Sequence, residues 1–208
     1  MVISSLERQK KHLVKLCFDN GEEFLLDMDI CAENSLCKDM EIEAEELKKL
    51  SFESDYRRAK SRALWYLDRS DYTEKAMYQK LLRAGFEKKA SAEVIARFVE
   101  LGIIDDRRFA ERFFERCCES NISKREALHK MLNKGIPYDL AKEMLESSEV
   151  DEEEQIKNLL ERKYSSKLSA EKGTEKVFAA LMRKGFSYSA IRSALKQYNE
   201  ELEFSEEY

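Results

Sequence analysis

The sequence predicts a mainly α-helical protein: three tandem three-helix repeats that form an elongated curved array, preceded by a small N-terminal extension with a β-hairpin and short helices. Three observations predict this fold. A 50-residue pattern recurs three times, and the 208 residues include only one proline and six glycines. The charged fraction of 38% is typical of helices with long solvated faces. No apolar run approaches the length of a membrane-spanning helix.

The repeat is marked by Gly85, Gly135 and Gly185, which are 50 residues apart. Their flanking segments share apolar positions at helical spacing. These segments are Tyr78 to Phe86, Leu128 to Ile136 and Phe178 to Phe186. Each segment predicts a helix that a glycine ends in the left-handed conformation, with the next residue folding back onto the last turn.

The start of each of these helices is also marked. Thr73 and Ser123 lie 12 residues before their glycines and are expected to be N-caps, and Gly173 with Thr174 takes that place in the third copy. Pro137 follows the second glycine, where a first helical turn tolerates proline. One unit of three short helices cannot bury its own apolar stripes, so the units are expected to stack.

A further helix precedes each copy, over residues 57–67, 106–118 and 151–163. The expected organisation is an extension over residues 1–52, repeats over 53–104, 105–148 and 149–198, and an acidic tail over 199–208. In the extension, alternating apolar residues on both sides of Asn20-Gly21 predict a β-hairpin over about residues 12–30. Residues 31–50 are expected to form one or two short acidic helices.

The charges are distributed unevenly along the chain. The net charge of −5 would by itself disfavour a polyanionic partner. Residues 1–55 hold 7 basic and 14 acidic side chains, net −7; residues 56–145 hold 20 and 14, net +6; residues 146–208 hold 10 and 14, net −4. A ligand feels the local field, so the basic middle segment indicates an anionic partner. The alternative is that helices simply carry solvated Lys and Arg.

The stretch from Gly102 to Arg116, Gly-Ile-Ile-Asp-Asp-Arg-Arg-Phe-Ala-Glu-Arg-Phe-Phe-Glu-Arg, followed by Leu128 to Ile136, resembles the RecX family of recombination regulators. Residues 63–69 and 81–86 are similar to the first repeat of that family. Residues 40–50, with the hairpin before them, resemble the N-terminal extension of some members. The resemblance covers about residues 12–198.

The resemblance implies a non-enzymatic regulator that binds the RecA–single-stranded DNA filament and modulates, mostly inhibits, its ATPase activity, strand exchange and growth. It implies a bacterial cytoplasmic protein of homologous recombination, DNA repair regulation and the SOS response. The expected partners are RecA and single-stranded DNA, the latter weakly or through the filament. We expect a monomer with no metal, cofactor or membrane contact. The alternative is a helical-repeat adaptor that binds another protein without nucleic acid.

Basic side chains at helical spacing are the candidate partner and nucleic-acid site, because guanidinium groups donate paired hydrogen bonds to phosphate and carboxylate. These residues are Arg58, Arg62, Arg69, Arg108, Arg112, Arg116, Lys124 and Arg125. We expect them to line a concave basic face. The alternative is pairing within the helix, because Glu111 and Glu115 lie three or four residues from the arginines.

Aromatic residues beside these arginines have two interpretations: base-stacking platforms or core packing, of which the helical spacing favours the core. They are Trp65, Tyr66, Phe109, Phe113 and Phe114.

Other candidate chemical groups have simpler structural interpretations. Asp105 and Asp106 could bind a metal, although a helix cap and its first turn explain them better. His12 and His129 are too few and too far apart for a zinc site or a catalytic triad. The adjacent cysteines 117–118 could be redox-active or small apolar fillers. The chain contains no Gly-x-x-x-x-Gly-Lys-Ser/Thr motif, which argues against its own ATP turnover.

Overall fold

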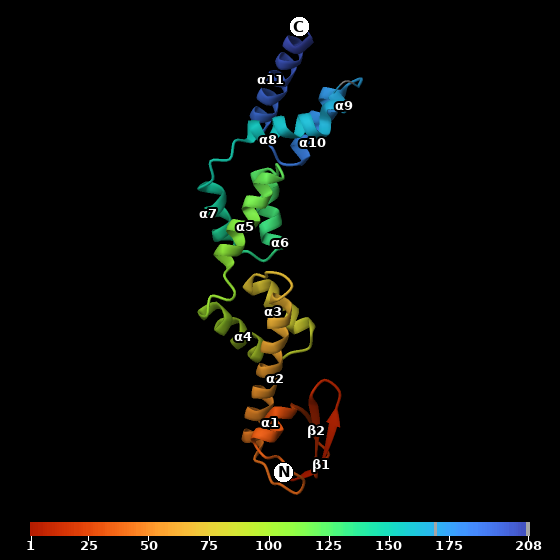
Figure 1. The fold of residues 1–208 in the computed structure, drawn as a ribbon, viewed down its shortest axis with the longest axis vertical. Coiled ribbons are helices and arrows are strands. Elements are labelled where there is room, and N and C mark those ends of the chain that lie inside the picture. The colour runs from red at the N-terminus through yellow and green to blue at the C-terminus, as the bar shows by residue number, and fades with distance from the viewer. Residues whose placement is uncertain (169, 207–208) are drawn as a thin grey trace. The chain divides into compact units, whose positions relative to one another are not determined.

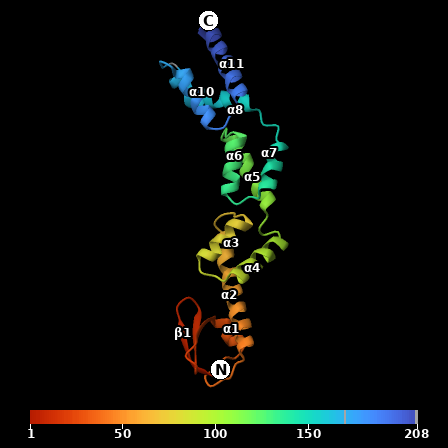
Figure 2. The same ribbon diagram turned by 180° about the vertical axis from the view of Figure 1, so that it is seen from behind.

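A computed structural model describes residues 1–168 and 170–206 of the chain (Figure 1). The chain divides into two compact units, residues 1–105 and residues 106–208. Both units are mainly helical, which confirms the predicted fold class, and the first also contains a small sheet; Figure 2 shows the ribbon from behind. Within the described ranges, no helix combines the length and apolar character that a membrane span requires.

An antiparallel sheet stands at the start of the first unit. Its strands follow sequence order: β1 (Ile3–Gln9), β2 (Leu13–Phe18) and β3 (Glu23–Asp27). The predicted hairpin is formed by β2 and β3, which pair with Leu16 opposite Phe24, and Gly21 in the turn has a φ of +84°. Strand β1 was not predicted. Its register shifts between Ile3 and Ser5 and its last three residues are exposed, so the alternation typical of a strand is absent.

Helix α1 (Met28–Glu33) follows the sheet directly. Its N-cap is Asp27, whose carboxylate accepts a hydrogen bond from the Asp29 amide at 3.0 Å. The Asp27 amide in turn donates to the Ser54 hydroxyl at 2.7 Å in a buried position. Ser54 belongs to the helix that follows α1 in the chain, so this bond joins the end of the sheet to that helix and fixes where α1 begins.

Helix α2 (Ala44–Leu67) belongs to both the extension and the first repeat. Leu47 packs in the core under the sheet, whereas Ala63 packs in the core of the first repeat. The boundary expected after residue 52 therefore falls inside a helix. Residues 44–67 contain no glycine or proline to interrupt it, so the helix runs through.

The first repeat is completed by α3 (Glu74–Arg83) and α4 (Lys88–Glu100). Met77, Leu81 and Phe98 are almost fully buried in its core. Phe86, in the turn between the two helices, packs partly buried against this core. The turn therefore lies against α2, where the basic side chains begin.

The second unit contains two further repeats. The elements of the first of these are α5 (Asp106–Glu119), α6 (Lys124–Asn133) and α7 (Tyr138–Glu146). The others are α8 (Glu152–Leu159), the π-helical turn η1 (Leu160–Tyr164), α9 (Ser165–Leu168), α10 (Gly173–Arg183) and α11 (Tyr188–Glu206). The helix expected over 151–163 thus continues through η1 into α9. Helix α11 includes residues 199–206 of the expected acidic tail, and residues 207–208 lie outside the described part.

The three marker glycines end their helices as predicted. Gly85, Gly135 and Gly185 have φ angles of +90°, +88° and +89°, which only glycine adopts without strain. In each case the next amide donates to the carbonyl five residues earlier, which is the bond that closes a Schellman motif. The pairs are Phe86 to Leu81 at 3.3 Å, Ile136 to Met131 at 3.1 Å and Phe186 to Leu181 at 3.3 Å.

Two of the three predicted N-caps are confirmed. The Thr73 hydroxyl accepts from the Ala76 amide, and the Ser123 hydroxyl accepts from the Glu126 amide, both at 3.2 Å. Pro137 stands at the N-cap of α7, one residue before its first turn.

The expected cap at Gly173 and Thr174 is wrong. Helix α10 begins at Gly173 itself, and the cap residue is Lys172 in the left-handed conformation. The reason is close backbone approach: a side chain at residue 173 would collide with the carbonyl oxygens of Lys167 and Leu168. Glycine here is required by packing of the preceding segment, not by capping.

Candidate functional site

The basic side chains of the first unit gather around one exposed indole. Trp65 is 46% exposed, and the Arg69 guanidinium lies 3.7 Å from its ring centroid. Arg69 also donates to the Trp65 carbonyl at 2.7 Å, so this arginine is held on the ring. The Arg62 guanidinium lies 5.5 Å from the Trp65 centroid and 6.0 Å from that of Tyr66. Cation–π attraction of this kind keeps a guanidinium near an aromatic face while its N–H groups stay available.

The three arginines differ in how far acidic groups neutralise them. Arg58 pairs with Asp55 at 3.2 Å and lies 5.5 Å from the Phe86 centroid. Arg69 has Asp68 at 3.7 Å. Arg62 contacts only aromatic rings among the residues that the structure describes. Among these three arginines, Arg62 is therefore the one whose charge is most available to an external anion.

Arg58, Arg62, Trp65 and Phe86 line one cleft of about 480 Å³. The remaining lining residues come from α2 and from the N-terminal sheet and its junction with α1: Lys11, His12, Asp27, Asp29, Arg57 and Ser61. The extension and the first repeat therefore build this cleft together. Sequence reasoning did not place Lys11 or His12 in the site, although Lys10-Lys11-His12 is a basic cluster at the end of a strand.

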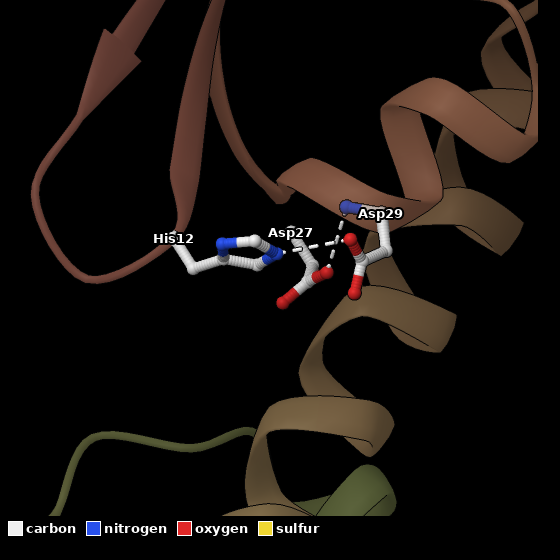
Figure 3. Close-up of side chains that lie close together, drawn as sticks. All are labelled: His12, Asp27 and Asp29. Atoms are coloured by element: carbon white, nitrogen blue, oxygen red, sulfur yellow. Dashed lines mark hydrogen bonds and ion pairs between the residues drawn. The ribbon is translucent and has the colours of Figure 1, made fainter.

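Figure 3 shows His12 reaching from the β1–β2 turn toward Asp27 and Asp29 at the start of α1. The ligand atoms of the three lie within 4.8 Å of one another. Asp29 accepts from His12 Nε2 at 2.9 Å and has Arg57 Nη1 at 3.8 Å. The three groups therefore bind residues of the protein itself, and the guanidinium beside them opposes a metal cation.

Arg57 itself is bound to a second acid. Its Nη2 donates to Glu33 at 2.8 Å, and this hydrogen bond raises the pKa of Arg57. The effect is to fasten α2 to α1 on the wall of the cleft.

The second unit carries the other predicted arginines on α5. Arg108, Arg112 and Arg116 are all exposed and follow one another at four-residue spacing. Arg112 Nε donates to the Arg108 carbonyl at 3.4 Å, and the Arg116 guanidinium lies 5.8 Å from the Phe113 centroid. The helix therefore presents three guanidinium groups along one face.

Lys124 and Arg125 both contribute to packing within the second unit, and Arg125 does so between the second and third repeats. Lys124 Nζ donates to the Ser148 carbonyl at 3.0 Å. The aliphatic part of Arg125 lies against Gly185, where an added Cβ would come within 3.0 Å of its Cβ. Both side chains thus have structural partners that the sequence did not indicate.

The five aromatic candidates separate into two groups. Tyr66 packs partly buried in the core of the first repeat, and Phe109, Phe113 and Phe114 pack on the core of the second. The Phe109 and Phe113 rings stack with centroids 6.2 Å apart. Trp65 is the exception, because almost half of it is exposed.

The acidic pair and the cysteines lie near α5. The helix starts at Asp106, whose carboxylate stands in the first turn where the helix dipole favours it. Cys117 is buried and Cys118 half-buried, and burial raises the pKa of both thiols. His129 lies on α6, separated from the described group at His12 by the division between units.

Two family models match parts of this chain, and known proteins resemble it along most of its length. The RecX first three-helix domain matches residues 59–98, and the RecX third three-helix domain matches residues 151–195. The "Regulatory protein RecX" of Clostridium tetani is 27% identical over 202 residues, covering 94% of this chain and 93% of that protein. The protein of the same name from Streptococcus pneumoniae (strain ATCC BAA-255 / R6) is 29% identical over 205 residues, covering 98% and 79%.

Solved structures share the fold. A crystal structure of regulatory protein RecX aligns with a TM-score of 0.66 at 21% identity, covering 94% of this chain and 98% of the other. RecX from Lactobacillus salivarius aligns with a TM-score of 0.61 at 21% identity, covering 70% and 97%.

Proposed function

Because the chain belongs to the RecX family, we propose that it is a non-enzymatic regulator that binds the RecA–single-stranded DNA filament. In this role it mostly inhibits the ATPase activity, strand exchange and growth of the filament. It works in the cytoplasm as a monomer, with RecA as its main partner and with single-stranded DNA contacted weakly or through the filament. The role requires no metal, cofactor or catalytic group of its own.

The arginine face of α5 is the observation that carries this proposal to particular residues. Three exposed guanidinium groups at residues 108, 112 and 116 stand on one helix. Guanidinium groups bind phosphate and carboxylate with paired hydrogen bonds, so the face suits both the DNA backbone and acidic protein surface. A filament presents both of these chemistries.

The test is the rate of RecA ATP hydrolysis on single-stranded DNA as the full chain is added. We expect the wild type to inhibit at stoichiometric amounts, and the triple variant Arg108→Glu, Arg112→Glu, Arg116→Glu to require at least roughly tenfold more protein, since each lost phosphate or carboxylate contact weakens binding. Inhibition should weaken as salt rises.

A matched control changes the same total charge elsewhere on the second unit. Lys142, Lys163 and Lys196 are exposed, and their triple replacement by Glu should leave inhibition within about twofold of the wild type. Unchanged inhibition by the arginine variant would reject the α5 face. No effect of the wild type on RecA would reject the regulator role and favour a protein-binding adaptor without nucleic acid.

A further inference from the structure

We propose that the cleft of the first unit holds one nucleotide of single-stranded DNA, with its phosphate between Lys11 and Arg62 and its base against Trp65. The N-terminal sheet is then part of a nucleic-acid site and not only a cap on the first repeat. This inference rests on the proposed function, because the filament carries the single-stranded DNA.

The cations of the cleft differ in whether an acidic group already neutralises them. Arg57 is bound to Glu33 at 2.8 Å, and Arg58 to Asp55 at 3.2 Å. Lys11 and Arg62 both line the cleft and are exposed, and neither has an acidic partner in the described part of the chain. Two unneutralised cations that line the same cleft, one from the β1–β2 turn and one from α2, suit an anionic group.

The same cleft is also lined by two carboxylates, and an unpaired carboxylate would repel phosphate. Asp29 is held by His12 at 2.9 Å, with Arg57 at 3.8 Å. Asp27 is only 6% exposed and accepts from a backbone amide as the N-cap of α1. Both acids therefore already have partners within the protein, although Asp29 itself is exposed.

These acids also position Lys11. The β1–β2 turn holds Lys11 and His12 in the left-handed conformation, with φ of +61° and +62°. The contact of His12 with Asp29, visible in Figure 3, fastens this turn to the start of α1. The backbone that carries Lys11 is thereby fixed beside the cleft, so this backbone loses little further freedom on binding.

Trp65 lines the cleft with an exposed ring on which a base can stack. Trp65 is 46% exposed, and one guanidinium already covers its ring at 3.7 Å, so the indole is oriented by Arg69 before any ligand arrives. Bases stack on exposed aromatic rings beside a cationic groove without regard to sequence. An acidic peptide would satisfy the cations but would have no use for the indole.

The size of the cleft sets the scale of the ligand. A volume of about 480 Å³ lies within the usual range of about 300–1,000 Å³ for small-molecule sites. A cleft of this volume can hold one unstacked nucleotide. Single strands can present such a nucleotide because their bases are free to leave the stack.

The experiment uses the fact that Trp65 is the one tryptophan of the chain. We titrate the full-length protein with a short oligothymidylate and follow its tryptophan fluorescence. Binding in the cleft should quench the emission. Lys11→Glu and Arg62→Glu should each weaken binding about tenfold and reduce the log–log salt slope by about 0.7, the value for one phosphate contact on a single strand.

Matched controls lie beside both residues. Lys10 and Lys60 are exposed and do not line the cleft, so Lys10→Glu and Lys60→Glu should bind within about twofold of the wild type. For the base, a labelled oligothymidylate followed by anisotropy should bind Trp65→Ala roughly 5- to 100-fold more weakly, and Trp65→Phe should restore most of this loss.

Three results would contradict the proposal that the cleft binds a nucleotide. These are no quenching by the oligonucleotide, equal weakening by the Lys10 and Lys60 variants, or quenching by an oligoglutamate peptide that displaces the DNA. If the wild type inhibits RecA under conditions where no quenching occurs, nucleotide binding in the cleft is rejected and the proposed regulator role is retained. If quenching and its loss in the variants are observed without any effect on RecA, nucleotide binding in the cleft is retained and the proposed regulator role is rejected.

Discussion

The hydroxyl of Ser123 donates a hydrogen bond to the backbone carbonyl of Lys184, 61 residues away. The same oxygen accepts from the Glu126 amide at 3.2 Å as the N-cap of α6. Lys184 is the C-cap of α10 and directly precedes Gly185. The buried Ser123 hydroxyl thus caps the N-terminus of α6 in the second repeat and binds the C-cap carbonyl of α10 in the third.

Replacement of Ser123 by Ala should therefore cost more than the loss of an ordinary cap. An N-cap contributes about 1 kcal/mol, and a half-buried carbonyl left unpaired costs about 1 kcal/mol more. We expect the free energy of unfolding to fall by about 2 kcal/mol, measured from the urea unfolding midpoint of the second unit. Ser123→Gly keeps most of the intrinsic capping preference and should lose about half as much. A loss of only a few tenths of a kcal/mol in Ser123→Gly would show that the bond to Lys184 contributes nothing.

Gly185 and Gly85 have the same conformation but different surroundings, so Gly→Ala at the two positions should differ. Both have φ near +90°, and strain at this angle costs an alanine about 1 kcal/mol. At Gly85 an added Cβ meets nothing within 4 Å, whereas at Gly185 it lies 3.0 Å from Arg125 Cβ and 3.1 Å from Ser123 Oγ.

We expect Gly185→Ala to destabilise its unit by about 1–2 kcal/mol more than Gly85→Ala destabilises its own, because the crowded site must shift. Urea unfolding of the full chain, read with hydrogen exchange to separate the two units, measures both. An equal loss at the two glycines would mean that Arg125 moves aside without cost.

The glycines also show how much of the fold could be predicted. Gly85, Gly135 and Gly185 required a left-handed residue at fixed spacing, which is local information and is written in the sequence. The cap at Gly173 was predicted wrongly because its reason is a contact with the carbonyl of Lys167, which no local pattern reports. Strand β1 was missed for the same reason, since it is stabilised by pairing with β2 and not by its own alternation.

The candidate site divides in the same way. Helical spacing was enough to place Arg108, Arg112 and Arg116 on one face of α5. It could not show that Lys124 bonds the Ser148 carbonyl, that Arg125 packs against the third repeat, or that Lys11 lies in one cleft with Arg62. Those relationships join residues far apart in the chain, so they depend on the tertiary fold.

The pair Arg107 and Glu143 leads to a pH prediction. Arg107 donates two hydrogen bonds to the Glu143 carboxylate, at 2.8 and 3.0 Å, joining α5 to α7. These bonds hold the pKa of Glu143 below its usual range. A depressed folded-state pKa stabilises the fold above the unfolded pKa, and this contribution is lost as the pH falls through the folded value.

Carboxyl titration by NMR should therefore place Glu143 below an ordinary glutamate, and Arg107→Gln should return it to the ordinary range. The stability difference between the wild type and this variant should shrink as the solution becomes more acidic than the Glu143 midpoint. Arg97→Gln, which removes a pair with Glu100 in the first unit, is the control and should leave the Glu143 titration unchanged. An unshifted Glu143 in the wild type would contradict the prediction.

The cysteines should differ sharply in reactivity. Cys37 is exposed, whereas Cys117 is only 3% exposed and burial raises the pKa of its thiol. The thiolate is the reactive form, so both poor access and a raised pKa slow alkylation. We expect iodoacetamide to modify Cys37 at least roughly tenfold faster than Cys117 in the folded protein, measured by peptide mass spectrometry. In urea the two rates should converge, because unfolding removes both effects. Equal rates in the folded protein would instead support a reactive role for the adjacent cysteines 117–118.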